Sequence, residues 1–279
     1  MPISRPFILL LVAPSALVLV LIFVVPFGWF QIGSLAQFGS VPELLHQIRT
    51  IVLSNAMTKS SIATVQIAVP TTLLTLGIGY PLAYAATRAG PWSSRAIMCS
   101  VLLPHFTSVI VRTYALMVVL GRTGLVNSVM HNLGLANEPV QLLYNRGAVI
   151  VGMTYVLLPY MVLTLYTAMR HIDRRLLLAA AGMGASGTQT FFRVFLPLTW
   201  HAVVAGSLLV FILAIGFFVT PALLGGPGDL MVGMLIERQI ELANNWPVAS
   251  VMSLVLLVAT FAIYFVYNRF ANAPGDTLA

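Results

Sequence analysis

The sequence predicts an all-α polytopic membrane protein with about six transmembrane helices, and two observations predict it. The first is composition: 59% of the 279 residues are hydrophobic, 8% are charged, and the mean hydropathy is +0.97. A soluble domain carries about 25% charged residues, so this chain has too few for a soluble surface. The second is the length of the apolar runs, which reach the roughly 20 residues that cross a bilayer as a helix.

Six apolar segments organise the chain, which we therefore treat as a single transmembrane domain of residues 1–279. The first segment is too long for a signal-peptide core and has no clear small-residue cleavage site after it, so we expect it to remain as a span. A polar connection with a short helix near residues 42–53 follows it. The expected spans are residues 7–30, 62–86, 96–120, 148–169, 202–224 and 248–267.

The charges between the spans predict the orientation. With the N-terminus in the cytoplasm, the inner side carries eight arginines against two aspartates, and the outer side carries five basic residues against five acidic ones. Cytoplasmic loops are enriched in Lys and Arg. We therefore expect both termini and the polar segment 170–201 to be cytoplasmic. Topology also accounts for the net charge of +7, so we expect the lipid bilayer and no nucleic acid as a partner.

The sequence lacks the residues that several other functions require. The single lysine, Lys59, has no Gly-rich loop before it, so the chain cannot bind ATP through a P-loop. The five histidines are scattered, which argues against a metal site. The tetrapeptide at residues 184–187 matches the Gly-x-Ser-Gly of intramembrane proteases but lies outside the spans. No acidic residue lies within a span, which argues against coupling to protons or sodium.

The segment 170–201 is an island of mixed polarity between two apolar runs. It begins with a helix for which Asp173 is the expected N-cap, and the glycines within 182–187 should end that helix. A second short amphipathic turn should follow, closed by Pro197. The expected result is a helical hairpin at a membrane face, with small side chains that let a partner subunit approach its backbone.

This island resembles the cytoplasmic EAA loop in the permease subunits of ABC importers. That loop reads Glu-Ala-Ala, three residues, Gly, nine residues, then Ile-x-Leu-Pro. The family's Glu falls on Leu178, which removes a charge from the expected ATPase contact. The resemblance predicts an ATPase-coupling loop that contains Leu178, Ala179, Ala180, Gly184, Ala185, Val194, Leu196 and Pro197.

Other stretches narrow the resemblance to the spermidine/putrescine type of permease. They are Ser108-Val-Ile-Val-Arg-Thr-Tyr-Ala, Leu120-Gly-Arg-Thr-Gly-Leu-Val-Asn-Ser, Phe218-Val-Thr-Pro-Ala-Leu-Leu-Gly-Gly-Pro and Asn245-Trp-Pro. The resemblance implies a type I ABC importer fold in the bacterial inner membrane. It also implies two ABC ATPase subunits, a second permease as a homologous heterodimer partner and a periplasmic solute-binding protein.

The same resemblance implies that this chain is not an enzyme and binds no cofactor, because ATP and Mg²⁺ belong to the ATPases. The expected solute is a polyamine or a related organic cation. Two alternatives remain open at this point. One is an importer of another small organic solute, such as an opine or an amino-acid derivative, and the other is a secondary transporter.

Two places are candidates for the translocation pathway. Arg112 lies near the middle of the third expected span, where a charge costs several kcal/mol unless it is paired or hydrated. It either holds a gate or extends toward the outer surface. The aromatic residues of the fifth span either line the pore, where they would suit an alkylammonium group, or pack in the core. The candidate pore or gate residues are Arg112, Tyr114, Phe217, Phe218, Thr220 and Pro221.

Overall fold

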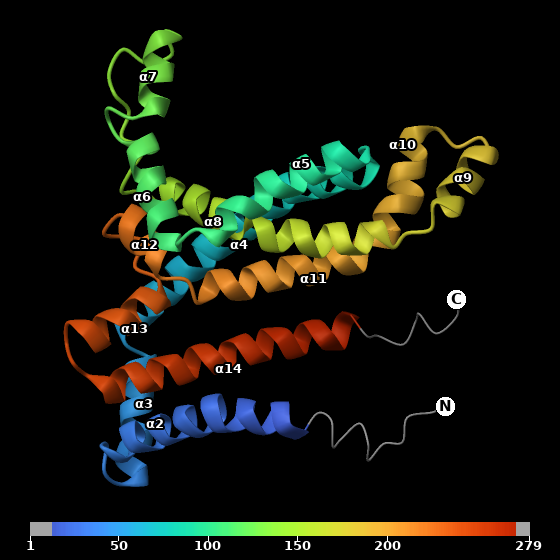
Figure 1. Ribbon diagram of the computed structural model, residues 1–279. Coiled ribbons are helices and arrows are strands. Elements are labelled where there is room, and N and C mark those ends of the chain that lie inside the picture. The colour runs from blue at the N-terminus through green and yellow to red at the C-terminus, as the bar shows by residue number, and fades with distance from the viewer. Residues whose placement is uncertain (1–12, 272–279) are drawn as a thin grey trace.

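The computed structural model describes residues 13–271, which form helices joined by loops with no β-strand among them (Figure 1). The short elements η1 (Val20–Val24) and η3 (Phe191–Phe195) are π-helical, and η2 (Leu103–Phe106) is a 3-10 helix. The α-helices are α2 (Val25–Ala36), α3 (Val41–Val52), α4 (Asn55–Arg88), α5 (Pro91–Leu102), α6 (Val109–Leu120), α7 (Leu125–Asn132), α8 (Arg146–Arg170), α9 (Arg174–Gly182), α10 (Gly187–Thr190), α11 (Leu196–Ile215), α12 (Val219–Leu224), α13 (Val232–Glu241) and α14 (Trp246–Ala271).

Within residues 13–271, six stretches are long and apolar enough to cross a membrane, which confirms the expected all-α class and the expected number of about six spans. Residues 7–12 of the first expected span lie outside the described residues. So do the two termini, whose charges entered the orientation count. The short helix expected near 42–53 is α3. The six stretches are Ala13–Ala36, Asn55–Arg88, Val109–Asn132, Arg146–Arg170, Gly187–Ile215 and Trp246–Tyr267.

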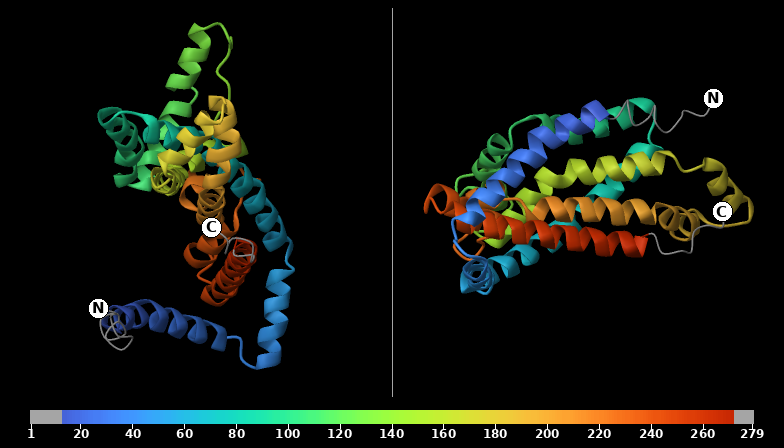
Figure 2. Two further views of the ribbon diagram at one scale, coloured as in Figure 1. Left: turned by 90° about the vertical axis from the view of Figure 1, so that its right-hand side faces the viewer. Right: turned by 90° about the horizontal axis from the view of Figure 1, so that it is seen from below.

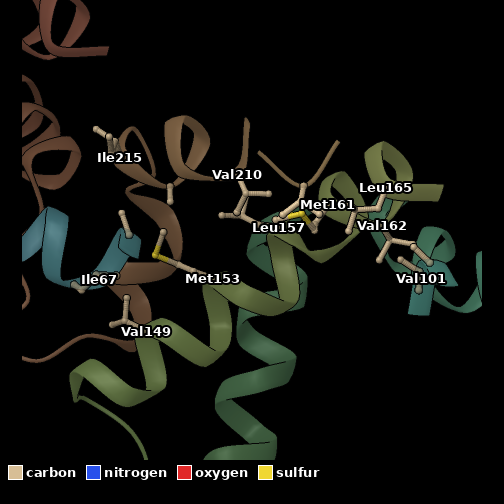
Figure 3. Packing of buried hydrophobic residues seen from close by; sticks show 14 of the residues in the cluster. Ile67, Val101, Val149, Met153, Leu157, Met161, Val162, Leu165, Val210 and Ile215 are labelled. Carbon is tan, nitrogen blue, oxygen red and sulfur yellow. The ribbon is translucent and has the colours of Figure 1, made fainter. Parts of the chain in front are cut away.

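The core lies where α8 packs against α4 and α11 (Figures 1 and 2). Most of the labelled core side chains in Figure 3 come from α8. Apart from Val162, these α8 side chains belong to a row of every fourth residue, which is one ridge of a helix, and each member of the row is at most 3% exposed. The row consists of Val149, Met153, Leu157, Met161, Leu165 and Met169.

Met161 shows how closely these helices approach one another. A Cβ atom on Gly79 of α4 would lie 2.9 Å from the Cγ of Met161, and one on Gly206 of α11 would lie 3.0 Å from its Sδ. Small residues at helix interfaces let membrane helices approach closely and gain dispersion contacts. The methionine therefore fills a space that two glycines leave open.

Replacing Gly79 by valine is expected to destabilise the protein by about 1–3 kcal/mol, because an overpacked core forces side chains from their rotamers. The matched control is Gly77→Val in the same helix, since no atom lies within 4 Å of a Cβ there. Thermal unfolding in detergent measures the difference. Adding Met161→Ala should recover part of the loss from Gly79→Val. Equal effects of the two single valine variants would contradict this packing.

The third expected span, residues 96–120, is wrong as a single helix. The chain leaves α5 at Leu102, passes through η2, and adopts extended backbone at Thr107 before α6 begins. Pro104 cannot donate a helical hydrogen bond, and the Thr107 hydroxyl donates to the Pro104 carbonyl at 2.7 Å, which stabilises the local turn instead. As a result α6 and α7 stand out from the bundle while α5 runs along it (Figure 1).

The fifth expected span, residues 202–224, is displaced, and the expected role of Pro197 is wrong. The helical path runs from Gly187 to Ile215 through η3, and Pro197 lies in the first turn of α11. The wider π-helical turn just before Pro197 lets the path continue although proline has no N–H to donate. Helix α11 ends before Gly216, and α12 begins at Val219.

Candidate functional site

The polar island forms a helical hairpin, residues 173–190, beyond the ends of α8 and α11 (Figure 1). Asp173 caps α9 as predicted: its carboxylate accepts a hydrogen bond from the backbone N–H of Arg175 at 2.9 Å. The glycine break is also confirmed. Gly184 adopts φ +86°, and the following N–H of Ala185 reaches the Ala180 carbonyl at 3.1 Å. Only glycine adopts that backbone conformation without strain, so Gly184 sets the direction of the second arm.

The second arm begins with a reciprocal cap. Ser186 Oγ accepts the backbone N–H of Gln189 at 3.3 Å, and Gln189 Oε1 accepts the N–H of Ser186 at 2.9 Å. From there α10 continues through η3 into α11 without an intervening loop. The hairpin is therefore joined rigidly to a membrane-spanning helix.

Aromatic rings fix the base of the hairpin to the bundle. The ring centre of Tyr84, near the end of α4, lies 5.3 Å from that of Phe191 and 5.0 Å from that of Phe195. Both pairs meet edge to face, a favourable geometry worth about 0.5–1.5 kcal/mol for each pair. A displacement of the hairpin would therefore act on α4 as well as on α11.

The residues of the predicted coupling loop divide between an outer surface and the base. Leu178 is 71% exposed, whereas Ala180 is 5% exposed. Ala179, Gly184 and Pro197 are exposed as well. Ala185, Val194 and Leu196 are half-buried.

The sequence reasoning missed Met183, which is 83% exposed and directly follows the last residue of α9, at the turn of the hairpin. It also missed a groove of about 830 Å³ between α9 and the end of α4, lined among others by Tyr84, Arg88, Leu177 and Leu178. A large apolar residue next to the glycine break was the signal available. The hairpin thus presents exposed apolar side chains where the bundle itself ends.

The two groups of candidate pathway residues come together, although they are about a hundred residues apart in the sequence. The hydroxyl oxygens of Thr113 on α6 and Thr220 on α12 lie 3.2 Å apart. Helix α8 makes room for α12 at Gly152, where a Cβ would lie 2.4 Å from Leu224 and 2.9 Å from Thr220. Helices α6, α8 and α12 therefore meet at one place.

Within that meeting place the candidates differ in exposure. Arg112 is 6% exposed, and its Nε has no hydrogen-bond partner among residues 13–271. Thr220 and Pro221 are buried, and Phe217 is half-buried. Tyr114 and Phe218 are 54% and 43% exposed, so these two rings face outward from the chain.

An ion pair that the sequence reasoning did not find holds the opposite end of the bundle. Arg146, the first residue of α8, donates from Nε to Asp229 at 2.9 Å and from a terminal nitrogen to Gln66 on α4 at 2.6 Å. The other oxygen of Asp229 accepts the N–H of Gly226 at 3.1 Å. It is the sole carboxylate–guanidinium pair within the described part of the chain. The loop between α12 and α13 is thereby tied to α4 and α8.

Helix α13 carries an acidic pair one turn apart. Partial burial raises the pKa of Glu237, and a hydrogen bond from its protonated form to Glu241 raises it further. No group of three metal-ligating side chains comes together within residues 13–271.

Comparisons with known proteins agree with this architecture. Residues 76–273 match the family model described as binding-protein-dependent transport system inner membrane component. The chain is 37% identical over 227 residues to the spermidine/putrescine transport system permease protein PotB of Haemophilus influenzae, covering 81% of this chain and 77% of that protein. It is 35% identical over 199 residues to PotB of Escherichia coli K12, covering 71% and 72%.

Solved structures share the fold at low sequence identity. A chain of a bacterial alginate ABC transporter in complex with a pentasaccharide-bound periplasmic protein superposes with a TM-score of 0.76 at 18% identity, over 96% of this chain and 95% of that one. A chain of the MetNI methionine ABC transporter gives a TM-score of 0.60 at 17% identity, over 78% and 98%. The family match and the PotB relatives establish the identity: the chain belongs to the binding-protein-dependent transport system inner membrane components, which are multi-pass transport subunits rather than enzymes.

Proposed function

We propose that this chain is the permease subunit of an ATP-driven importer and forms part of the path for a polyamine such as spermidine or putrescine. The observation that carries the proposal is the hairpin 173–190, which presents exposed apolar residues outside the bundle and joins α11 without a loop. The identity of 37% to a spermidine/putrescine permease supports the solute class.

In this proposal two ATPase subunits bind the hairpins of this chain and of a second, homologous permease, and the ATPases hold ATP and Mg²⁺. The residues that contact the ATPase are the exposed ones of the predicted loop, with Leu178 in place of a glutamate, and Met183 joins them. Closure of the ATPases displaces the hairpin. Because Tyr84 packs on Phe191 and Phe195, the displacement acts on α4 and α11 together.

The hairpin end faces the cytoplasm in this proposal, and the end with α13 faces a solute-binding protein. When ionised, Glu237 and Glu241 on α13 attract a cation that arrives at that end, and Arg238 between them offsets part of this attraction. Exposed aromatic rings at Tyr114 and Phe218 provide faces for alkylammonium groups at about 1–2 kcal/mol each when desolvated. Arg112 is buried on the same helix as Tyr114, two residues before it, and its positive charge repels a cation that passes nearby.

Uptake by reconstituted transporter tests the function. Proteoliposomes that contain this chain and its co-purified subunits, with the solute-binding protein outside, should accumulate labelled spermidine or putrescine when ATP is supplied to the ATPases. A non-hydrolysable ATP analogue should stop uptake, and dissipation of the proton gradient should not. Uptake that needs the gradient and ignores ATP would instead identify a secondary transporter. ATP-driven uptake of another organic solute, with no polyamine uptake, would overturn the solute assignment alone.

A further inference from the structure

A pocket lined by four arginines lies where α4, α5, α8 and α9 meet. Its volume is about 740 Å³, and its polar lining includes two hydroxyl side chains whose oxygens lie 3.4 Å apart. We call it the arginine pocket. Its charged and hydroxyl-bearing lining residues are Arg88, Ser94, Arg95, Tyr166, Arg170 and Arg174.

The four positive charges face no carboxylate within residues 13–271. The nearest acidic residue in the sequence, Asp173, caps the first turn of α9 by accepting from the N–H of Arg175. The ion pair that the structure does contain, Arg146 with Asp229, lies at the other end of the bundle. Four guanidinium groups around one cavity repel one another unless an anion lies between them.

Helix dipoles account for two of the four arginines and not for the other two. Arg88 ends α4 and Arg170 ends α8, where a positive charge is favourable. Arg174 begins α9, and Arg95 lies one turn into α5, so both are near the positive ends of their helices. A cation gains nothing from the dipole at those places, whereas an anion bound between them gains from the dipole and from the arginines.

The pocket lies at the level where the apolar spans end. The candidate spans Asn55–Arg88 and Arg146–Arg170 terminate at two of its arginines. Trp92, at the start of α5, is 81% exposed, and the guanidinium carbon of Arg95 lies 5.6 Å from the centre of its ring. Exposed tryptophan together with arginine at the ends of spans is typical of the phospholipid headgroup region.

We propose that the arginine pocket binds the phosphate of an anionic phospholipid, with its acyl chains along the membrane-facing sides of α4 and α5. The planar guanidinium groups of Arg95 and Arg170 suit two oxygens of one phosphate, and the hydroxyls of Ser94 and Tyr166 donate to the headgroup. The site holds α5 against α8 and steadies the base of the hairpin. This inference goes beyond transport itself and does not depend on which solute is carried.

The test uses the full-length chain with its co-purified subunits in neutral detergent. Phosphatidylglycerol in mixed micelles should raise the melting temperature in a saturable way, and phosphatidylcholine should not. The double variant Arg95→Gln/Arg170→Gln should require roughly thirtyfold more phosphatidylglycerol for the same shift, from about 1 kcal/mol for each arginine. When the two proteins are purified from native membranes, mass spectrometry should detect less bound anionic lipid on the double variant than on the wild type.

Two control variants test whether lipid binding depends on the arginines of the pocket. Arg95→Lys/Arg170→Lys keeps the topology signal and the charge but loses the planar fork, so it should fall between wild type and the Gln variant. Arg49→Gln/Arg122→Gln removes two exposed arginines outside the pocket and should leave lipid binding unchanged.

If Arg49→Gln/Arg122→Gln weakened phosphatidylglycerol binding as much as the pocket variant, the proposed site would be wrong. If inorganic phosphate raised the melting temperature as much as phosphatidylglycerol, the pocket would bind a free anion rather than a lipid. A Gln variant that binds phosphatidylglycerol normally but loses its ATPase subunits would assign the arginines to the partner protein instead.

Discussion

Replacing Gly184 by valine is expected to lower ATPase recruitment and ATP-driven uptake by about tenfold or more while the chain stays folded in the membrane. Gly184 adopts φ +86°, and no atom lies within 4 Å of a Cβ built on it, so the effect arises from backbone strain and not from a clash. Left-handed backbone costs an L-residue about 1–2 kcal/mol, more for a β-branched one, and 1.4 kcal/mol is a tenfold change in binding. The strain is relieved by turning α9 relative to α10, which misaligns the exposed surface.

Asparagine at the same position provides the control, because asparagine tolerates the left-handed conformation far better than valine. Gly184→Asn should retain most ATPase binding, measured by co-purification and by solute-stimulated ATP hydrolysis. Melting temperatures of the permease domain should be similar for the two variants. If valine and asparagine recruited the ATPase equally well, the turn at Gly184 would have no role in docking.

Removing the Arg146 side chain is expected to destabilise the protein more than neutralising Asp229. The Asp229 side chain is 8% exposed, so Arg146→Gln leaves a buried carboxylate with the N–H of Gly226 as its remaining partner. The Arg146 side chain is 42% exposed, so Asp229→Asn leaves a guanidinium that water can reach. We expect losses of about 2–3 kcal/mol and about 1 kcal/mol, below the roughly 3–5 kcal/mol for a fully buried pair.

Chemical denaturation in detergent measures this asymmetry, with Arg122→Gln as the control for loss of an exposed arginine. The double variant Arg146→Gln/Asp229→Asn should be more stable than Arg146→Gln alone, because it removes the unpaired buried charge. Equal losses for the two single variants would show that the pair acts as a surface salt bridge and does not anchor the loop.

Local sequence signals predicted the hairpin well because its geometry is set within a few residues. The Asp173 cap and the turn at Gly184 each depend on backbone groups at most four residues away. The break before α6 and the continuation through Pro197 were missed because hydropathy measures polarity and not hydrogen bonding. Both depend on how neighbouring backbone compensates for a proline.

Long-range pairings were beyond sequence reasoning. Arg146 and Asp229 are 83 residues apart, and Thr113 and Thr220 are 107 apart. The sequence around each of these four residues does not indicate which residue it will pair with. The two members of a pair come together only when the helices pack against one another. The arginines of the pocket were assigned to topology for the same reason: their convergence on one cavity is a property of the packed helices.

If the hairpin is the element on which the ATPase docks, a cross-linker attached to its exposed end should reach the ATPase. A cysteine would replace Met183, which is 83% exposed, in a chain whose native Cys99 is changed to serine. A photoactivatable cross-linker on that cysteine, activated in native membranes, should capture a subunit with nucleotide-binding motifs. The same probe at Leu135, which is 73% exposed beyond α7, should not (Figure 1). Capture of the ATPase from Leu135 and not from Met183 would show that the ATPase docks near α7 and not on the hairpin.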